Sequence, residues 1–327
     1  MKIIAFFNNK GGVGKTTTVY HIAWMLAELN YKVLAVDLDP QSNLSSMFLT
    51  TEKMEDIILE EKKITILDAI IPISEGDPYL PVHIESISSN LHLLIGNLSL
   101  SAFEDILSDA WTKCLEGDPH AFKLTSSFKT LIEDASARCN PEFVLIDVGS
   151  NLGAVNRAVL ISTDFVVLPV ASDLFSLQAI KNLGRTLSGW NTQWNKRIEK
   201  SPKSDKSGIP NGKMKPIGYL FMQYTAKENQ PVRSTIKWAD KIPGVYQKEV
   251  LTNNDATPPS SVESDENCLA MLKHYHSLAP MSMEAKKPIF LLKPADGAIG
   301  AHYQAVQKCY KDFKALSNRI ISIIQQD

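Results

Sequence analysis

The stretch NNKGGVGKTTT, residues 8–18, determines how the rest of this 327-residue chain is interpreted. It follows an apolar run, KIIAFF at 2–7, and it opens a segment of helical periodicity, KTTTVYHIAWMLAELN at 15–30. Glycines at 11, 12 and 14 allow the backbone to bend tightly between the two elements. A strand, a glycine-rich turn and a helix in this order predict a loop that binds phosphate.

The residue types of this loop suit a nucleotide with a metal ion. Backbone N–H groups and the amino end of the helix attract phosphate oxygens. Lys15 is expected to neutralise the β- and γ-phosphates, and the Thr16 hydroxyl to bind Mg²⁺. The predicted nucleotide-binding residues of the loop are Gly11, Gly12, Val13, Gly14, Lys15, Thr16 and Thr17, and Lys10 directly precedes them.

Short apolar runs recur along the chain, and helix-like segments separate most of them. The runs are apolar throughout rather than alternating, as expected of strands that are covered on both faces. Strands that alternate with helices predict a doubly wound α/β fold with a mainly parallel sheet flanked by helices. The runs are 2–7, 32–39, 91–96, 142–148, 164–171, 217–223 and 288–293.

The composition is that of an ordinary globular protein, with 44% hydrophobic and 21% charged residues and a formal net charge of −2. The four cysteines are scattered, which favours reduced thiols over a disulfide framework or a metal site. The run at the start is too short for a secretory signal, and no stretch is long enough to span a membrane. We therefore expect a cytoplasmic protein.

Residues 1–327 are interpreted as a single domain that ends in a long amphipathic helix at 300–327. The inward stripe of that helix is predicted to be Val306, Cys309, Phe313, Leu316, Ile320 and Ile323. Residues 195–215 are rich in Lys, Ser, Pro and Gly, which predicts a basic loop insertion. Residues 252–267 are polar and turn-rich and lead into 268–283.

Two motifs together resemble the ParA/MinD family of ATPases, in particular its ParA branch. KGGVGKTTT at 10–18 is similar to the family's deviant Walker A box, and VDLDPQSN at 36–43 is similar to its D-x-D-P-Q-x-N segment. LIDVGSNLG at 145–153 lies where the family has its Walker B strand and switch II, and 168–180 resembles its next strand and turn. The resemblance covers most of residues 1–190 and implies a P-loop ATPase; 252–287 is interpreted as a family-atypical insertion.

The resemblance implies a separate role for Lys10. In this family the first lysine of the box contacts the phosphates bound by the other subunit of a sandwich dimer. Lys10 is therefore expected to act in trans, in a homodimer that forms around two ATP molecules. Two facing lysines repel one another, and ATP replaces that repulsion with charge-assisted contacts.

The resemblance also implies the hydrolytic residues of a Mg²⁺-dependent ATPase that forms ADP and phosphate. Asp39 is expected to orient the attacking water and to contact the magnesium shell, together with the catalytic lysines Lys10 and Lys15. Asp147 closes an apolar strand and is expected to hold Mg²⁺, with Thr16 and Asp39 as the other metal residues. Asp37 is expected to support the loop or the magnesium shell.

The sequence departs from the family pattern after Asp147. The family usually has D-x-P-P, whereas this chain has Asp147-Val148-Gly149-Ser150. Because Gly149 is freer than proline, we expect a more mobile switch II backbone. The departure leaves the hydrolysis rate and the coupling to a partner open.

The base is expected to be adenine. The guanine motif N-K-x-D is absent, since NKRI at 195–198 has Ile198 at the position of the aspartate. Pro294 and Asp296 stand where the family's last strand meets its base-contacting loop, so they are candidate adenine neighbours.

The resemblance implies non-specific DNA and a ParB-like or other activating protein as partners, and hence association with the nucleoid. Basic residues of the C-terminal half are the candidate DNA contacts: Lys196, Arg197, Lys200, Lys203, Lys206, Lys308, Lys311, Lys314 and Arg319. A membrane is not expected as a partner, because the chain carries no Lys or Arg after Arg319.

The implied function is to segregate or position DNA or another cargo by slow, partner-stimulated ATP hydrolysis. Two alternatives stay open at this point. The same switch could serve a protein assembly or a defence complex, which the altered switch II and residues 252–287 allow. An ATP-dependent biosynthetic enzyme of the same fold, such as dethiobiotin synthetase, is less consistent with the D-x-D-P-Q segment.

Overall fold

The structure is a computed structural model that describes residues 1–59, 63–202, 208–224, 226–227, 230–231, 238–255, 257–275 and 277–326. Its centre is an eight-stranded sheet in the order β10-β7-β6-β1-β5-β2-β4-β3. The strands are β1 (Lys2–Phe6), β2 (Val33–Leu38), β3 (Glu85–Ser88), β4 (Leu91–Leu94), β5 (Phe143–Val148), β6 (Phe165–Ala171), β7 (Lys215–Tyr224) and β10 (Cys268–Lys273). A separate antiparallel pair consists of β8 (Ala226–Lys227) and β9 (Gln230–Pro231).

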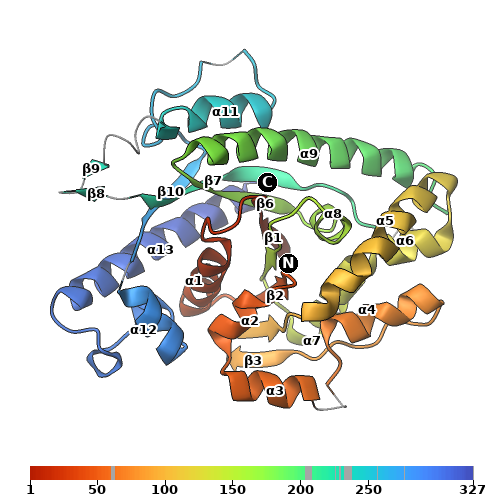
Figure 1. Ribbon diagram of the computed structural model, residues 1–327, viewed down its shortest axis with the longest axis horizontal. Coiled ribbons are helices and arrows are strands. Elements are labelled where there is room, and N and C mark those ends of the chain that lie inside the picture. The colour runs from red at the N-terminus through yellow and green to blue at the C-terminus, as the bar shows by residue number, and fades with distance from the viewer. Residues whose placement is uncertain are drawn as a thin grey trace.

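The pairings of the main sheet are parallel except for β3 with β4. All six residues of β2 and all six of β5 are buried, as the continuous apolar runs predict for central strands. Helices cover both faces of the sheet (Figure 1). The predicted doubly wound α/β fold is therefore confirmed.

The two faces of the sheet carry separate hydrophobic cores. One face packs against α1 (Lys15–Glu28), α2 (Asn43–Phe48), α3 (Thr51–Leu59), α12 (Leu278–Ala285) and α13 (Ala301–Gln325). The opposite face packs against α4 (Ile66–Glu75), α5 (Glu104–Lys113), α6 (Pro119–Thr125), α7 (Ser127–Cys139), α8 (Ala154–Ile161), α9 (Leu174–Ile198) and α11 (Ile242–Glu249). Figure 1 shows α1 and α13 on one side of β1, with α8 and α5 on the other.

The C-terminal helix is confirmed as amphipathic. Val306, Cys309, Phe313, Leu316 and Ile320 of α13 are buried against the sheet, and Ile324 is buried one turn later, whereas Ile323 is only partly buried. The four cysteines are free, as expected from their spacing.

The strand predicted at 288–293 is wrong. Ile289–Leu291 form a 3₁₀ helix, η3, and Ile289 and Phe290 are buried in the core beside α13. A short apolar run has no periodicity that separates a strand from another buried segment. The edge position beside β7 is taken by β10, which lies within the segment 252–287. The other edge strand, β3, is polar and half-buried, so it carries no continuous apolar run.

The parallel arrangement determines where functional residues can gather. The carboxyl ends of β1, β2, β5 and β6 lie at the same edge of the sheet, because these strands are parallel neighbours. The loops that follow them are 7–14, 39–42, 149–153 and 172–173. In open α/β sheets, ligands bind at this edge.

Candidate nucleotide-binding site

The loop between β1 and α1 has the backbone that a phosphate-binding loop requires. Gly12 and Gly14 have φ angles of 72° and 84°, in the left-handed region that favours glycine. The Asn8 side chain fixes the loop, since its Nδ2 donates to Pro169 O at 2.6 Å and its Oδ1 accepts from Lys10 N at 2.9 Å. The amino end of α1 follows directly at Lys15.

A cavity of about 620 Å³ lies against this loop, within the size range of small-ligand sites. The seven consecutive residues 11–17 line one part of it, and Asp39, Gln41 and Asn43 line another. A further part is mainly apolar and comprises Met47, Ala279, Met283 and Ile289. The cavity therefore combines a polar, glycine-rich end with an apolar end, as a nucleotide needs for phosphates and base.

Lys15 lines the cavity and is only 6% exposed. Its Nζ donates a hydrogen bond of 2.6 Å to Ser150 Oγ, which belongs to the loop after β5. This contact joins two segments that are 135 residues apart in the chain. The structure thus brings the predicted phosphate lysine and the altered switch II segment together.

Two buried aspartates lie side by side beneath the cavity. Asp37 and Asp147 are register partners on β2 and β5. Asp37 Oδ2 accepts from Ser45 N and from Ser45 Oγ, both at 2.7 Å, so this carboxyl fixes the start of α2. Burial raises the pKa of Asp37 to about 7. Asp37 Oδ2 therefore supports the loop, which is the first of the two roles expected for this residue, whereas Oδ1 has no hydrogen-bond partner among the described residues and the role in the magnesium shell stays a prediction.

Asp147 is buried, and neither of its carboxylate oxygens makes a hydrogen bond of good geometry within the part of the chain that the structure describes, although the Thr16 hydroxyl is near enough to influence its pKa. Burial, and then the nearby charge of Asp37, raise the pKa of Asp147 to about 8, and the Thr16 hydroxyl and the Lys15 charge offset this only in part. A buried carboxyl without partners is costly unless a cation or a proton satisfies it. Asp147 is therefore suited to a cation.

These residues fit a magnesium ion that arrives with a nucleotide. Among the described residues, no group of three or more His, Cys, Asp or Glu side chains could hold a metal ion. Mg²⁺ is commonly bound by one or two protein oxygens together with substrate phosphates and water. Thr16 and Asp147 would be such protein groups. Asp39 lines the cavity wall, where its Oδ1 accepts from Gln41 N at 3.0 Å.

Lys10 is directed away from the cavity that the rest of the loop lines. Its Nζ forms an ion pair with Asp173, the N-cap residue of α9, and lies 3.4 Å from Ser176 Oγ. The Lys10 side chain keeps 30% of its surface exposed. The two lysines of the loop thus have different surroundings within one subunit.

The loop after β5 is contacted by two side chains, Asn156 and Glu104, and the mobility that Gly149 led us to expect stays a prediction. Asn156 Nδ2 donates to Gly149 O and to Asn151 O, both at 2.9 Å. Glu104, at the start of α5, accepts from Ala154 N and from Val155 N, the latter at 3.0 Å. These contacts anchor both ends of the segment 149–155.

Sequence reasoning missed His21, which lines the cavity from α1. Its Nδ1 donates to Thr17 O at 2.7 Å, and its Nε2 accepts from Ile289 N at 3.1 Å. Burial lowers the pKa of His21 to about 4. This neutral histidine therefore ties the phosphate-loop helix to η3, a contact across 268 residues that no local pattern could indicate.

The lining of the cavity includes neither Pro294 nor Asp296, so their assignment as adenine neighbours stays a prediction that this cavity does not support. They belong to a second 3₁₀ helix, η4 (Pro294–Asp296), in which Pro294 is exposed. Asp296 Oδ1 accepts from Lys287 Nζ at 2.8 Å. The assignment depended on a strand at 288–293. Because that segment is η3, Ile289 lines the cavity instead.

The candidate DNA contacts have different exposures. Lys308, Lys311, Lys314 and Arg319 are exposed on α13, and Lys196 and Lys200 lie at the end of α9. Arg197 is buried, stacks on Trp111 at 4.2 Å and donates to Trp111 O at 2.7 Å, so it is not available to DNA. Lys203 and Lys206 lie outside the described residues. No helix in the described ranges is long and apolar enough to cross a membrane.

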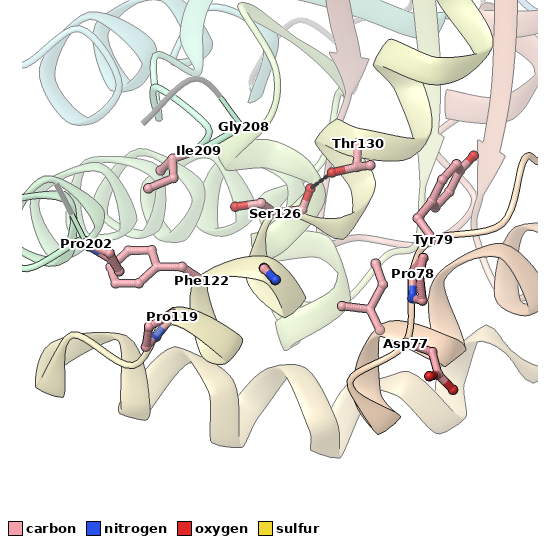
Figure 2. A pocket seen from close by; sticks show the side chains of 12 residues that line it. Asp77, Pro78, Tyr79, Pro119, Phe122, Ser126, Thr130, Pro202, Gly208 and Ile209 are labelled. Atoms are coloured by element: carbon pink, nitrogen blue, oxygen red, sulfur yellow. Dashed lines mark hydrogen bonds between the residues drawn. The ribbon is translucent and has the colours of Figure 1, made fainter. Parts of the chain in front are cut away.

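A second cavity, of about 380 Å³, lies away from the phosphate loop. Figure 2 shows Tyr79, Pro78, Phe122, Pro119 and Pro202 around it, with Ser126 between them. Its walls come from the α4–β3 connection, α6, α7 and the chain after α9. Its lining includes none of the predicted site residues, so the first cavity is the candidate functional site.

Comparison with known proteins agrees with this geometry. The family described as "AAA domain" matches residues 1–200. The chromosome partitioning protein ParA of Caulobacter vibrioides is 25% identical over 200 residues, which cover 61% of this chain and 67% of that protein.

Two solved structures share the fold. Protein DIP2308 from Corynebacterium diphtheriae has a TM-score of 0.69 at 26% identity and covers 88% of this chain and 97% of its own. McdA of Cyanothece, in a complex with ATP, has a TM-score of 0.66 at 14% identity and covers 98% of this chain and 96% of its own. The chain therefore belongs to the AAA-domain family and is a member of the ParA/MinD group of P-loop ATPases.

Proposed function

We propose that this protein is a Mg²⁺-dependent ATPase that works as a switch, in which ATP favours a sandwich homodimer and slow hydrolysis releases it. The observation that carries this proposal is that the side chains of the two lysines of one loop have different surroundings. Lys15 lines the cavity, whereas Lys10 does not line it and instead pairs with Asp173 while staying partly exposed. One lysine would serve the subunit's own nucleotide and the other the nucleotide of the partner.

The residues around the cavity would share the work of hydrolysis. Lys15 and the backbone of residues 11–17 would bind the phosphates, and Thr16 and Asp147 would hold Mg²⁺. Asp39 would orient the attacking water from the cavity wall. Phosphoryl transfer depends mainly on positioning and charge stabilisation, so one well-placed carboxylate is sufficient. The apolar end at Met47, Met283 and Ile289 would accept adenine.

The cargo that we propose is DNA, segregated or positioned with the help of a ParB-like or other activating protein. Support comes from the exposed basic residues of α13 and from the partition function in the name of the Caulobacter relative. DNA binding without sequence preference requires surface lysines and arginines rather than base-reading elements.

The test is the solution mass by light scattering, with ADP and with ATP, in the presence of Mg²⁺. Asp39→Ala slows hydrolysis so that the ATP state persists, and Lys10→Ala in that background is the comparison. The expected result is a doubled mass with ATP that Lys10→Ala abolishes. A mass that does not respond to nucleotide in the Asp39→Ala protein would contradict the switch and favour a metabolic enzyme of the same fold.

A further inference from the structure

Ser150 combines an unusual sequence position with an informative contact. It stands where the related ATPases usually have a proline, and its Oγ accepts the 2.6 Å hydrogen bond from Lys15 Nζ. Ser150 also lines the 620 Å³ cavity beside Asp39 and Thr16. Its hydroxyl is thus located at the amino group that would bind the β- and γ-phosphates.

The backbone around Ser150 is fixed, so the position of its hydroxyl is defined. Asn156 Nδ2 binds the carbonyl oxygens of the residues on either side of Ser150, at 2.9 Å each. Glu104 holds the N–H groups at the start of α8. Asn156 is itself buried, which limits its rotamers. A hydroxyl on such a support binds with little loss of conformational entropy.

We propose that the Ser150 hydroxyl is a ligand of the γ-phosphate and makes the site favour ATP over ADP; this inference rests on the proposed function, in which the cavity binds ATP. A serine hydroxyl has one donor and two acceptor positions. When it accepts from Lys15, its own hydrogen remains to donate to a phosphate oxygen. A proline at this position has neither a side-chain donor nor a backbone N–H.

The Ser150 hydroxyl distinguishes ATP from ADP because ATP has a γ-phosphate and ADP lacks it. With ATP, Ser150 donates to a charged oxygen while Lys15 is shared between the hydroxyl and the phosphates. With ADP, that charged acceptor is missing. Hydrogen bonds to charged groups contribute about 1.5–3 kcal/mol, which corresponds to roughly 10- to 150-fold in affinity.

The experiment measures equilibrium binding by calorimetry, with Mg²⁺ and either ADP or a non-hydrolysable ATP analogue. The variants are Ser150→Ala, which removes the hydroxyl, and Ser150→Thr, which keeps it. Ser162→Ala is the matched control, because the Ser162 hydroxyl at the other end of α8 binds only a backbone oxygen, Ala158 O at 2.9 Å, among the described contacts. Circular dichroism melting of each variant verifies that it folds.

The expected result is that Ser150→Ala weakens binding of the ATP analogue about 10-fold or more, leaves ADP binding within about 3-fold, and that Ser150→Thr restores the preference. An unchanged preference in Ser150→Ala would overturn the inference while leaving ATP binding intact. An equal loss for both nucleotides would also overturn it, since the hydroxyl would then only position Lys15. If the wild-type chain binds neither nucleotide, the proposed function itself fails.

Discussion

Lys10 and Asp173 form an ion pair that joins the phosphate loop to the amino end of α9. Lys10 is the lysine that we propose to bind the partner's nucleotide, so the ion pair between Lys10 and Asp173 would have to break when the dimer forms. Asp173 also caps α9 by accepting from Ser176 N at 2.9 Å. Lys10 beside it holds the pKa of Asp173 below its usual range, although burial opposes this.

Asp173→Asn is therefore expected to favour the ATP-dependent dimer. Asparagine keeps the capping oxygen but removes the charge that holds Lys10 in its own subunit. The ion pair is about one-third exposed, so the gain should be modest, roughly 2- to 5-fold in the dimer dissociation constant. Sedimentation equilibrium in the Asp39→Ala background measures it. A dimer weaker than that of the unmodified chain would show that Asp173 assists the trans contact instead.

His21 predicts a specific pH dependence of stability. Its pKa is about 4 in the folded chain and about 6.5 when unfolded, so the unfolded state binds the proton first as pH falls. The contribution of neutral His21 to the free energy of unfolding is fully present above pH 6.5 and is lost as the pH falls from 6.5 to 4. The loss at pH 5 relative to pH 7.5 is about 2 kcal/mol.

Denaturant unfolding at both pH values, for the wild type and for His21→Gln, isolates this contribution. Glutamine can donate and accept but does not titrate, so the difference between the two pH values should shrink by about 2 kcal/mol in the variant. An equal pH dependence in both proteins would show that His21 is not held neutral.

Two glycines of α9 provide an internal test of the packing between α9 and α11. A Cβ at Gly184 would lie 1.9 Å from Glu249 O, whereas a Cβ at Gly189 would meet nothing within 4 Å. Gly184→Ala is expected to destabilise the fold by about 2 kcal/mol or more, because backbone must move. Gly189→Ala should stabilise it by about 0.5–1 kcal/mol through helix propensity. The melting temperatures of both variants, compared with that of the wild type, test this prediction. Equal shifts for the two variants would contradict the close packing of α9 against α11 at Gly184.

The proposed DNA surface of α13 predicts a change in salt dependence. Replacing Lys308, Lys311 and Lys314 together by glutamine should lower the slope of log affinity against log salt by about 2–3, since each phosphate contact contributes about 0.9. Fluorescence anisotropy with duplex DNA, in the ATP state, measures the slope. Lys113→Gln on α5, where the lysine pairs with Asp109 at 2.7 Å, is the control for charge alone. If both variants keep the wild-type slope, α13 is not the DNA surface.

The sequence by itself determined the phosphate loop, the two lysines and the α/β architecture. These features depend on neighbouring residues: glycine allows the positive φ angles of Gly12 and Gly14, and continuous apolar runs such as 143–148 form buried strands. Asp147 could be found in the same way, because the end of a central parallel strand places a side chain at the ligand-binding edge.

Only the tertiary structure decided which distant residues meet. Ser150 meets Lys15 and Asp173 meets Lys10 across 135 and 163 residues, and no local periodicity records such pairs. The same holds for Arg197. Its charge led us to expect an exposed residue, but its guanidinium is buried against the Trp111 ring. Local propensity also could not choose between η3 and a strand at 288–293, because a short apolar run has no periodicity that separates the two. The packing of Ile289 and Phe290 in the core beside α13 depends on residues far apart in the chain, and no local segment of the sequence contains it.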